Sequence, residues 1–145
     1  SFSYIDAEFD SYTAEIANPN NPTTPYAKAI DKGNKIPGIA KNQAFTRIAW
    51  QPEQGFQAGL EARYMDKIYV DDINSDTAPS YTVVAANVGY LWVNRDWKVN
   101  SYARVDNLFD RNYVGSVIVN DGNSRFFEPA DGRNFSVGMS VTKAF

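Results

Sequence analysis

The sequence of 145 residues contains neither cysteine nor histidine. Without cysteine it can form no disulfide and no thiolate metal site, and without histidine it has no imidazole to bind a metal or to act as a base. Ser-His and Cys-His nucleophilic catalysis are therefore excluded within this chain. No other pairing of a nucleophile with a base emerges, so we expect no enzymatic activity and no bound cofactor.

Long apolar runs and basic charge are scarce as well. No run approaches the roughly 18 apolar residues that indicate a membrane-spanning helix. The net charge of −3 and the isoelectric point near 4.9 leave no basic stripe to neutralise phosphates, so we expect no nucleic-acid partner. A membrane β-barrel stays open, because its strands are only half apolar and the mean hydropathy of −0.44 does not reveal them.

The strongest positive signal is the last stretch of the chain, residues 133–145. Apolar side chains alternate there with small or polar ones, which places one face of a strand against an apolar medium and the other against water. An ordinary half-buried strand shows the same pattern. A strand that also stops on an aromatic residue is typical of the closing strand of an outer-membrane β-barrel. The apolar positions are Phe135, Val137, Met139, Val141 and Phe145.

Similar alternation recurs along the chain, and no stretch shows convincing helical periodicity. The sequence therefore predicts an all-β fold, an antiparallel up-and-down meander of about six strands. The predicted strands cover residues 2–12, 43–51, 55–70, 80–93, 96–109 and 133–145.

The connections between these strands alternate in length. Residues 52–55 and 94–96 are short and rich in the Pro, Gly, Asn and Asp of tight turns. Residues 13–42, 71–79 and 110–132 are long. A membrane barrel has short periplasmic turns at one rim and long extracellular loops at the other, whereas a soluble sandwich has no reason to sort its loops this way.

Side-chain chemistry also separates by face. Trp50, Trp92 and Trp97 lie beside the two short turns and predict an aromatic girdle at the headgroup boundary. The opposite strand face carries charged residues, which we expect to point into the barrel lumen and to line a water channel or the wall around a plug. The predicted lumen-facing residues are Arg47, Glu61, Arg63, Lys98, Arg104 and Asp106.

Two groups of acidic residues invite a metal interpretation. Residues 71–76 offer oxygen ligands at calcium-like spacing, but they lack the Gly and the terminal Glu of an EF-hand loop. Asp6, Glu8 and Asp10 share one face of the first predicted strand and repel one another unless a Lys or Arg intervenes. We predict no metal site in either group.

The last third of the chain carries a more specific pattern. A run from Asp106 to Asp110 is followed by an aromatic residue, a loop, a Gly-Arg pair that opens the last strand, and the terminal Phe145. This pattern resembles the C-terminal end of TonB-dependent outer-membrane receptors, and looser matches upstream extend the resemblance over nearly the whole chain. The motif residues are Asp106, Asn107, Leu108, Phe109, Asp110, Tyr113, Gly132 and Arg133.

The resemblance implies a large transmembrane barrel of about 22 strands with an N-terminal plug domain in its lumen. Members sit in the outer membrane of Gram-negative cells and import scarce ligands, most often ferric siderophores, with energy passed from the inner membrane by TonB. Residues 1–145 would be the C-terminal part of that barrel, without the plug domain, the earlier strands or the segment that contacts TonB.

The same resemblance implies the partners. They are a ferric siderophore or similar ligand, the plug domain and remaining strands, TonB, outer-membrane lipid, and the barrel-assembly machinery, which recognises the terminal aromatic residue, here Phe145. The long connections would form an extracellular gate, whose aromatic and cationic side chains are candidates to contact an anionic or aromatic ferric chelate. These candidates are Tyr26, Lys28, Lys32, Arg111, Tyr113, Arg125, Phe126 and Phe127.

Two other interpretations stay open at the level of sequence. One is a small complete outer-membrane barrel of structural or adhesin type, which needs an even number of at least about eight strands. The other is a soluble β-sandwich that binds a ligand through exposed aromatic residues.

Overall fold

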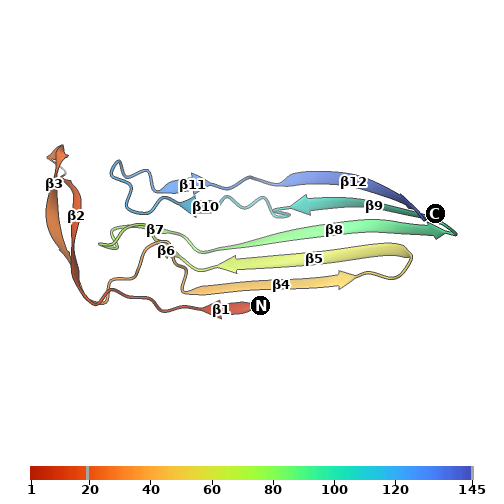
Figure 1. Ribbon diagram of the computed structural model, residues 1–145, viewed down its shortest axis with the longest axis horizontal. Helices are drawn as coiled ribbons and strands as arrows, with labels where there is room; N and C mark the ends of the chain where they lie inside the picture. The colour runs from red at the N-terminus through yellow and green to blue at the C-terminus, as the bar shows by residue number, and fades with distance from the viewer. Residues whose placement is uncertain (19, 145) are drawn as a thin grey trace.

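The computed structural model describes residues 1–18 and 20–144. All the regular secondary structure in this part of the chain is β-strand (Figure 1). Within the same residues no helix is long and apolar enough to cross a membrane. The strands are β1 (Phe2–Tyr4), β2 (Tyr12–Asn18), β3 (Asn21–Ile30), β4 (Asn42–Trp50), β5 (Gly55–Met65), β6 (Ile68–Tyr69), β7 (Thr77–Ala78), β8 (Tyr81–Asn94), β9 (Trp97–Asp106), β10 (Val114–Val117), β11 (Phe127–Pro129) and β12 (Asn134–Lys143).

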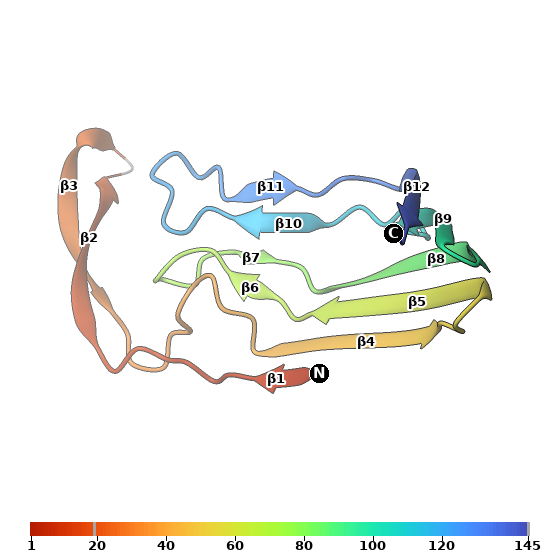
Figure 2. The same cartoon turned by 45° about the vertical axis from the view of Figure 1, so that its right-hand side comes forward.

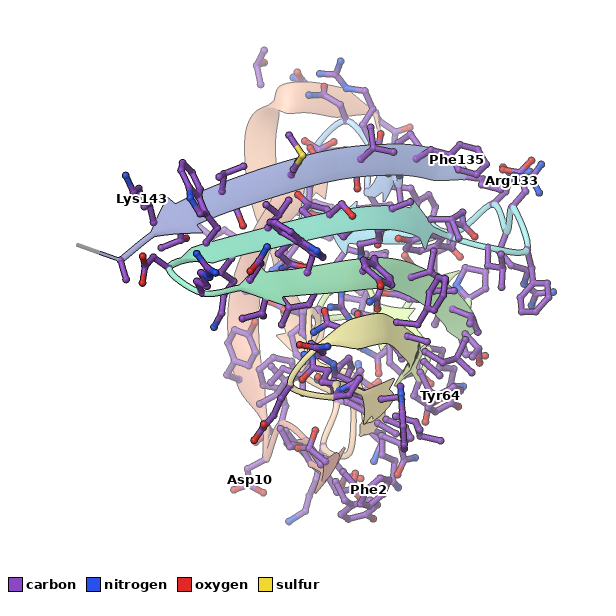
Figure 3. The ribbon with its side chains drawn as sticks, turned by 90° about the vertical axis from the view of Figure 1, so that its right-hand side faces the viewer. Phe2, Asp10, Tyr64, Arg133, Phe135 and Lys143 are labelled. Atoms are coloured by element: carbon purple, nitrogen blue, oxygen red, sulfur yellow. The ribbon has the colours of Figure 1, made fainter. Side chains whose placement is uncertain are left out.

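Six strands form one antiparallel sheet in the order β1-β4-β5-β8-β9-β12. Each strand after β1 pairs with the next long strand along the chain, so the predicted all-β meander is confirmed. The sheet is twisted and curved, which Figure 3 shows from the end that carries the short turns. Its two outermost strands, β1 and β12, each have a neighbour on one side only.

The alternation of short and long connections is also confirmed (Figures 1 and 2). Residues 51–54 join β4 to β5, and residues 95–96 join β8 to β9, at the same end of the sheet. Gly55 and Arg95 adopt the left-handed conformation that these tight turns require, with φ of 97° and 50°. The backbone N–H of Ala144 donates to the carbonyl of Asp96 at 2.7 Å, which joins the end of the last strand to the second turn.

The long connections contain structure that the sequence analysis did not predict. Each one folds back as a two-stranded hairpin: β2 with β3, β6 with β7, and β10 with β11. The hairpin β2–β3 stands across the ends of the other loops (Figure 2).

Two predicted strands are shorter in the structure. The strand expected over residues 2–12 ends as β1 at Tyr4, because the residues after Tyr4 bond to the later part of the same long connection. The Phe9 N–H donates to the Asn34 carbonyl at 2.8 Å, and the Ile36 N–H donates to the Ala7 carbonyl at 3.1 Å. The strand expected over 55–70 breaks after Met65, and its remainder pairs as β6.

The register sorts side chains onto two faces. On one of them, the apolar face, every side chain in the middle of the sheet is uncharged, and the rings and aliphatic chains are open to the surroundings. Phe135, Val137 and Met139 expose 75%, 82% and 70% of their surface. A soluble β-sandwich would cover such a face with a second sheet. In the described residues the other sheets are the three hairpins of the long connections, and none of them covers the apolar face, so that alternative is wrong.

The best-buried apolar side chains lie at the loop end, away from the middle of the sheet. Ile30, Ala40, Val70 and Ala78 are each at most 4% exposed and come from two of the long connections, between β1 and β4 and between β5 and β8. The long connections therefore form a small core of their own beyond the end of the sheet.

Candidate functional site

The six charged residues predicted to face the lumen share one face of the sheet, opposite the apolar face, and we call it the polar face. Arg47 lies directly opposite Glu61, and alternation along β5 and β9 places Arg63, Lys98, Arg104 and Asp106 on the same side. Trp50, Trp92 and Trp97 fall on the apolar face, near the short turns. The register thus supports the separation by face, while the lumen and the aromatic girdle stay predictions.

An ion-pair network on the polar face joins side chains from three strands, β4, β5 and β9. The Arg104 guanidinium on β9 donates to Glu61 Oε2 on β5 at 2.8 Å, across the intervening strand β8. The β8 residue opposite Glu61 is Ala85, whose side chain is only a methyl group. Arg104 also holds Asp106 at 2.8 Å, and Arg47 Nε lies 3.6 Å from the other oxygen of Glu61.

The two carboxylates of the polar face, Glu61 and Asp106, are both paired within this network. In the described part of the chain, no ion-pair partner is found for Arg63 or Lys98. The polar face therefore keeps a net positive charge, and its two exposed cations are available to a partner.

A cavity of about 360 Å³, the sheet cavity, lies where the polar face meets the long connections. Its floor is the charged network, and its rim is formed by Tyr81, at the start of β8, and Tyr113, beyond the end of β9. The two rings pack with their centroids 4.4 Å apart. Sequence reasoning did not name Tyr81 as a site residue, because its role at the cavity depends on a ring that lies 32 residues further along the chain.

The motif after β9 is a structural clamp. Asn107 is 3% exposed and left-handed, with φ of 51°. Its amide nitrogen donates to the carbonyls of Arg111 at 2.8 Å and Asp131 at 3.3 Å, and its oxygen accepts from the Arg111 N–H at 2.8 Å. The side chain thereby closes its own turn and ties it to the segment before β12.

Asp110 completes this clamp. Its Oδ1 accepts from the Arg133 backbone N–H at 2.9 Å, and a side chain at Gly132 would begin 3.2 Å from the same oxygen. The spacing of the motif therefore has a local cause: the residues around 107–110 and 132–133 fix the end of β9 against the start of β12.

A second junction fastens the long connections to one another. Asp72 accepts a short hydrogen bond from the Tyr12 hydroxyl, and its carboxylate and backbone N–H pair with the amide of Asn120 at 3.1 and 3.0 Å. Asn34 donates to the Asp72 carbonyl at 3.0 Å, and Asn74 bonds to the backbone of residue 35 in both directions. We call Tyr12, Asn34, Asp72, Asn74 and Asn120 the loop junction.

The loop junction explains part of the acidic cluster at residues 71–76. The carboxylate of Asp71 accepts from the backbone N–H and the hydroxyl of Ser75, and that of Asp72 is bonded to Tyr12, which raises the pKa of Tyr12 to about 12. Their oxygens are used for loop structure. Among the described residues no group of three or more acidic, His or Cys side chains is arranged to hold a metal.

The acidic residues near β1 are neutralised by lysines of the same loop. Lys35 Nζ binds Asp6 at 2.8 Å and also contacts Glu8, and Lys41 Nζ binds Asp6 at 3.1 Å. Hydrogen bonds from Lys35 and then Lys41 lower the pKa of the Asp6 carboxyl to about 2. These contacts hold the chain after β1 against residues 33–41.

This ion-pair cluster predicts a pH dependence. Because the folded pKa of Asp6 is lowered from 3.8 to about 2, its contribution is complete above the ordinary value and is lost as pH falls through about 2. In the full-length protein, amide-exchange protection at Ile5 and Ile36, corrected for intrinsic rates, should be constant above pH 4 and fall below it. Asp6→Asn should lower that protection at pH 6.

Asp10→Asn is the matched control, because the Asp10–Lys32 pair is almost fully exposed. It should leave protection at Ile5 and Ile36 unchanged. Equal protection in wild type and Asp6→Asn at pH 6 would contradict the assignment.

The candidate ligand-contacting residues divide between two further cavities. The hairpin cavity, of about 620 Å³, lies between β2–β3 and the loops around residues 72 and 122, and it includes Tyr26, Lys28 and Phe126. The aromatic cavity, of about 350 Å³, lies between the approach to β8 and the hairpin β10–β11, and it includes Arg111, Tyr113 and Phe127. The remaining two candidates, Lys32 and Arg125, line neither cavity.

A family model described as "TonB dependent receptor-like, beta-barrel" matches residues 1–108 of this sequence. The chain belongs to this family. The matched residues include the ion-pair network of the polar face and the first part of the clamp, up to Leu108. Membership in a family of receptors agrees with the expectation that the chain is not an enzyme.

Solved receptor structures share the fold of this barrel segment. The siderophore receptor PiuA from Acinetobacter baumannii is 26% identical, with a TM-score of 0.65 over 81% of this chain and 16% of PiuA. The ferric citrate transporter FecA, in its unliganded form, is 18% identical, with a TM-score of 0.65 over 83% of this chain and 20% of FecA. The ferric-catecholate import receptor Fiu from E. coli K12 is 21% identical, with a TM-score of 0.59 over 81% and 17%.

This receptor barrel segment therefore spans about a fifth or less of the length of the proteins it matches. The resemblance noted from the sequence is confirmed, and so is the fold class. The role of Phe145 as an assembly signal is not addressed, because that residue lies outside the described part of the structure.

Proposed function

We propose that this chain forms part of the wall and part of the extracellular gate of an outer-membrane receptor that imports a ferric siderophore with energy from TonB. The observation that carries the proposal is the match of residues 1–108 to the receptor barrel family. The uncharged apolar face suits lipid, and the polar face suits an interior that holds a plug domain.

The charge arrangement agrees with this assignment of the faces. Arg63 and Lys98 are exposed on the polar face and have no acidic partner in the described residues, as expected of a wall whose partner belongs to another part of the protein. The plug domain and the other strands would belong to the remainder of the receptor, and TonB would contact that remainder. The ligand class rests on PiuA and Fiu, whose names give a siderophore and a ferric catecholate.

The test is iron uptake by the Gram-negative cell that makes the full-length protein. Deleting its gene should abolish high-affinity uptake of iron from one siderophore, and the full-length gene should restore it. The same loss should follow when TonB is removed, because the barrel has no energy source of its own. Fractionation should find the protein in the outer membrane. Unchanged uptake from every siderophore offered, or uptake that persists without TonB, would overturn the proposal.

A further inference from the structure

The aromatic cavity differs from the other two in its charge. Its cationic side chain is Arg111, and no carboxylate lines it; the walls are Tyr81, Tyr113, Phe127, prolines and a valine. The hairpin cavity has the opposite balance, with four carboxylates against one lysine. Those residues are Glu15, Asp71, Asp72, Asp121 and Lys28.

The walls of the aromatic cavity are fixed before any ligand arrives. Tyr113 packs on Tyr81, and its carbonyl accepts from the Ala130 N–H at 3.0 Å. A Cβ at Gly115 would lie 3.0 Å from the Ala130 Cβ, so β10 approaches residues 127–130 as closely as a glycine allows. Phe127 is buttressed edge-on by Phe126, with ring centroids 6.3 Å apart. Rings held in this way lose little entropy on binding.

The cation of the cavity is free to act. The backbone of Arg111 is held on both sides by Asn107, and among the described residues its guanidinium has no acidic partner. A guanidinium presents planar donors to an oxyanion and also stacks on aromatic faces. The combination of fixed rings with one unpaired guanidinium is suited to a planar aromatic group that carries an oxyanion.

We propose that the aromatic cavity binds an aryl group with an adjacent oxyanion, either a carboxylate or a phenolate, as one part of the imported chelate. Arg111 holds the oxyanion, and Phe127 and Tyr113 hold the ring. The inference deepens the proposed function and rests on it for the identity of the whole ligand. It also assigns different roles to the two groups of candidate residues, since the acidic hairpin cavity repels the same oxyanion.

The test uses the full-length receptor in detergent micelles and salicylate as the probe, with binding followed by saturation-transfer difference NMR. Salicylate should bind. Cyclohexanecarboxylate should bind much more weakly because its ring is saturated and cannot stack as an aromatic ring does, and benzylamine should not bind because its charge is reversed. Arg111→Gln should weaken salicylate binding by about tenfold. Phe127→Leu should weaken it several-fold.

Matched controls separate local from general effects. Arg95→Gln makes the same change of charge at the opposite end of the sheet, and Phe109→Leu removes an exposed ring that lines none of the three cavities. Both should bind salicylate as the wild type does. The inference would be overturned if the wild type did not bind salicylate, or if Arg111→Gln and Phe127→Leu both bound it with the affinity of the wild type.

The uptake assay distinguishes this failure from failure of the proposed function. Siderophore uptake by cells whose receptor does not bind salicylate contradicts only the aryl site. Salicylate binding that depends on Arg111, in a protein whose deletion leaves iron uptake unchanged, supports the aryl site and contradicts import.

Discussion

Met139→Arg should destabilise the full-length receptor in a lipid bilayer by about 2–4 kcal/mol, the cost of an arginine at the bilayer midplane. Met139 stands near the middle of β12 on the apolar face, opposite Ser101 of β9, and is 70% exposed. No acidic side chain lies on that face within the sheet, so nothing pairs with the new charge. Reversible denaturation in lipid vesicles would measure the change.

Ser140→Arg is the control for this prediction. It places the same side chain one residue further along β12, and therefore on the polar face opposite Asn100. There the guanidinium meets water and polar neighbours, so the change should stay below about 1 kcal/mol. A comparable loss in both variants would show that the two faces do not differ in their surroundings, and would contradict the assignment of lipid to the apolar face.

Asn107→Ala should reduce the stability of the receptor by about 2–4 kcal/mol and lower the yield of folded protein in the membrane. The substitution leaves the carbonyls of Arg111 and Asp131 without the donor on the buried Asn107 side chain, and the Arg111 N–H without its acceptor. It also forces alanine into a left-handed conformation at φ of 51°. Heat-modifiable migration on gels would quantify folded receptor, and denaturation would give the free energy.

Asn112→Ala provides the comparison. Asn112 lies five residues along the same connection and is exposed, and no side-chain hydrogen bond within the described residues is found for it. The same truncation there should have little effect. If both variants fold to the wild-type level, the clamp between β9 and β12 is dispensable and the spacing of the motif has another cause.

The sheet was predictable because its sequence carries two signals that act over short distances. In β5 and β12 the period of two is clear, and the turns at 51–54 and 95–96 have the residues that tight turns need. The separation of charges onto one face followed from the same alternation.

The hairpins in the long connections were not predictable for specific reasons. In β3, Pro22 and Pro25 are unfavourable for a strand, and they are tolerated because β3 pairs on one side only. The strands β6 and β7 are two residues each, too short for any period to show. The run after Tyr4 does alternate, but it bonds to its own loop instead of extending the sheet.

The cavities were beyond sequence reasoning because they depend on distant pairs. Tyr81 meets Tyr113, and Asp72 meets both Tyr12 and Asn120, through packing that no local pattern encodes. The eight candidate loop residues were chosen by chemistry alone, and the structure assigns six of them to two cavities of different charge. The two acidic groups for which the sequence predicted no metal site bond to other parts of the long connections and hold them together.

The loop junction has a consequence for which parts of the long connections are free to vary in sequence. Tyr12 and Asn34 hold the base of the β2–β3 arm through Asp72, whereas many side chains further out on the arm, such as Glu15 and Thr23, are exposed. Changes at such positions should leave the hydrogen bonds between the long connections intact. Sequence differences between close relatives should therefore accumulate on the arm and spare its base.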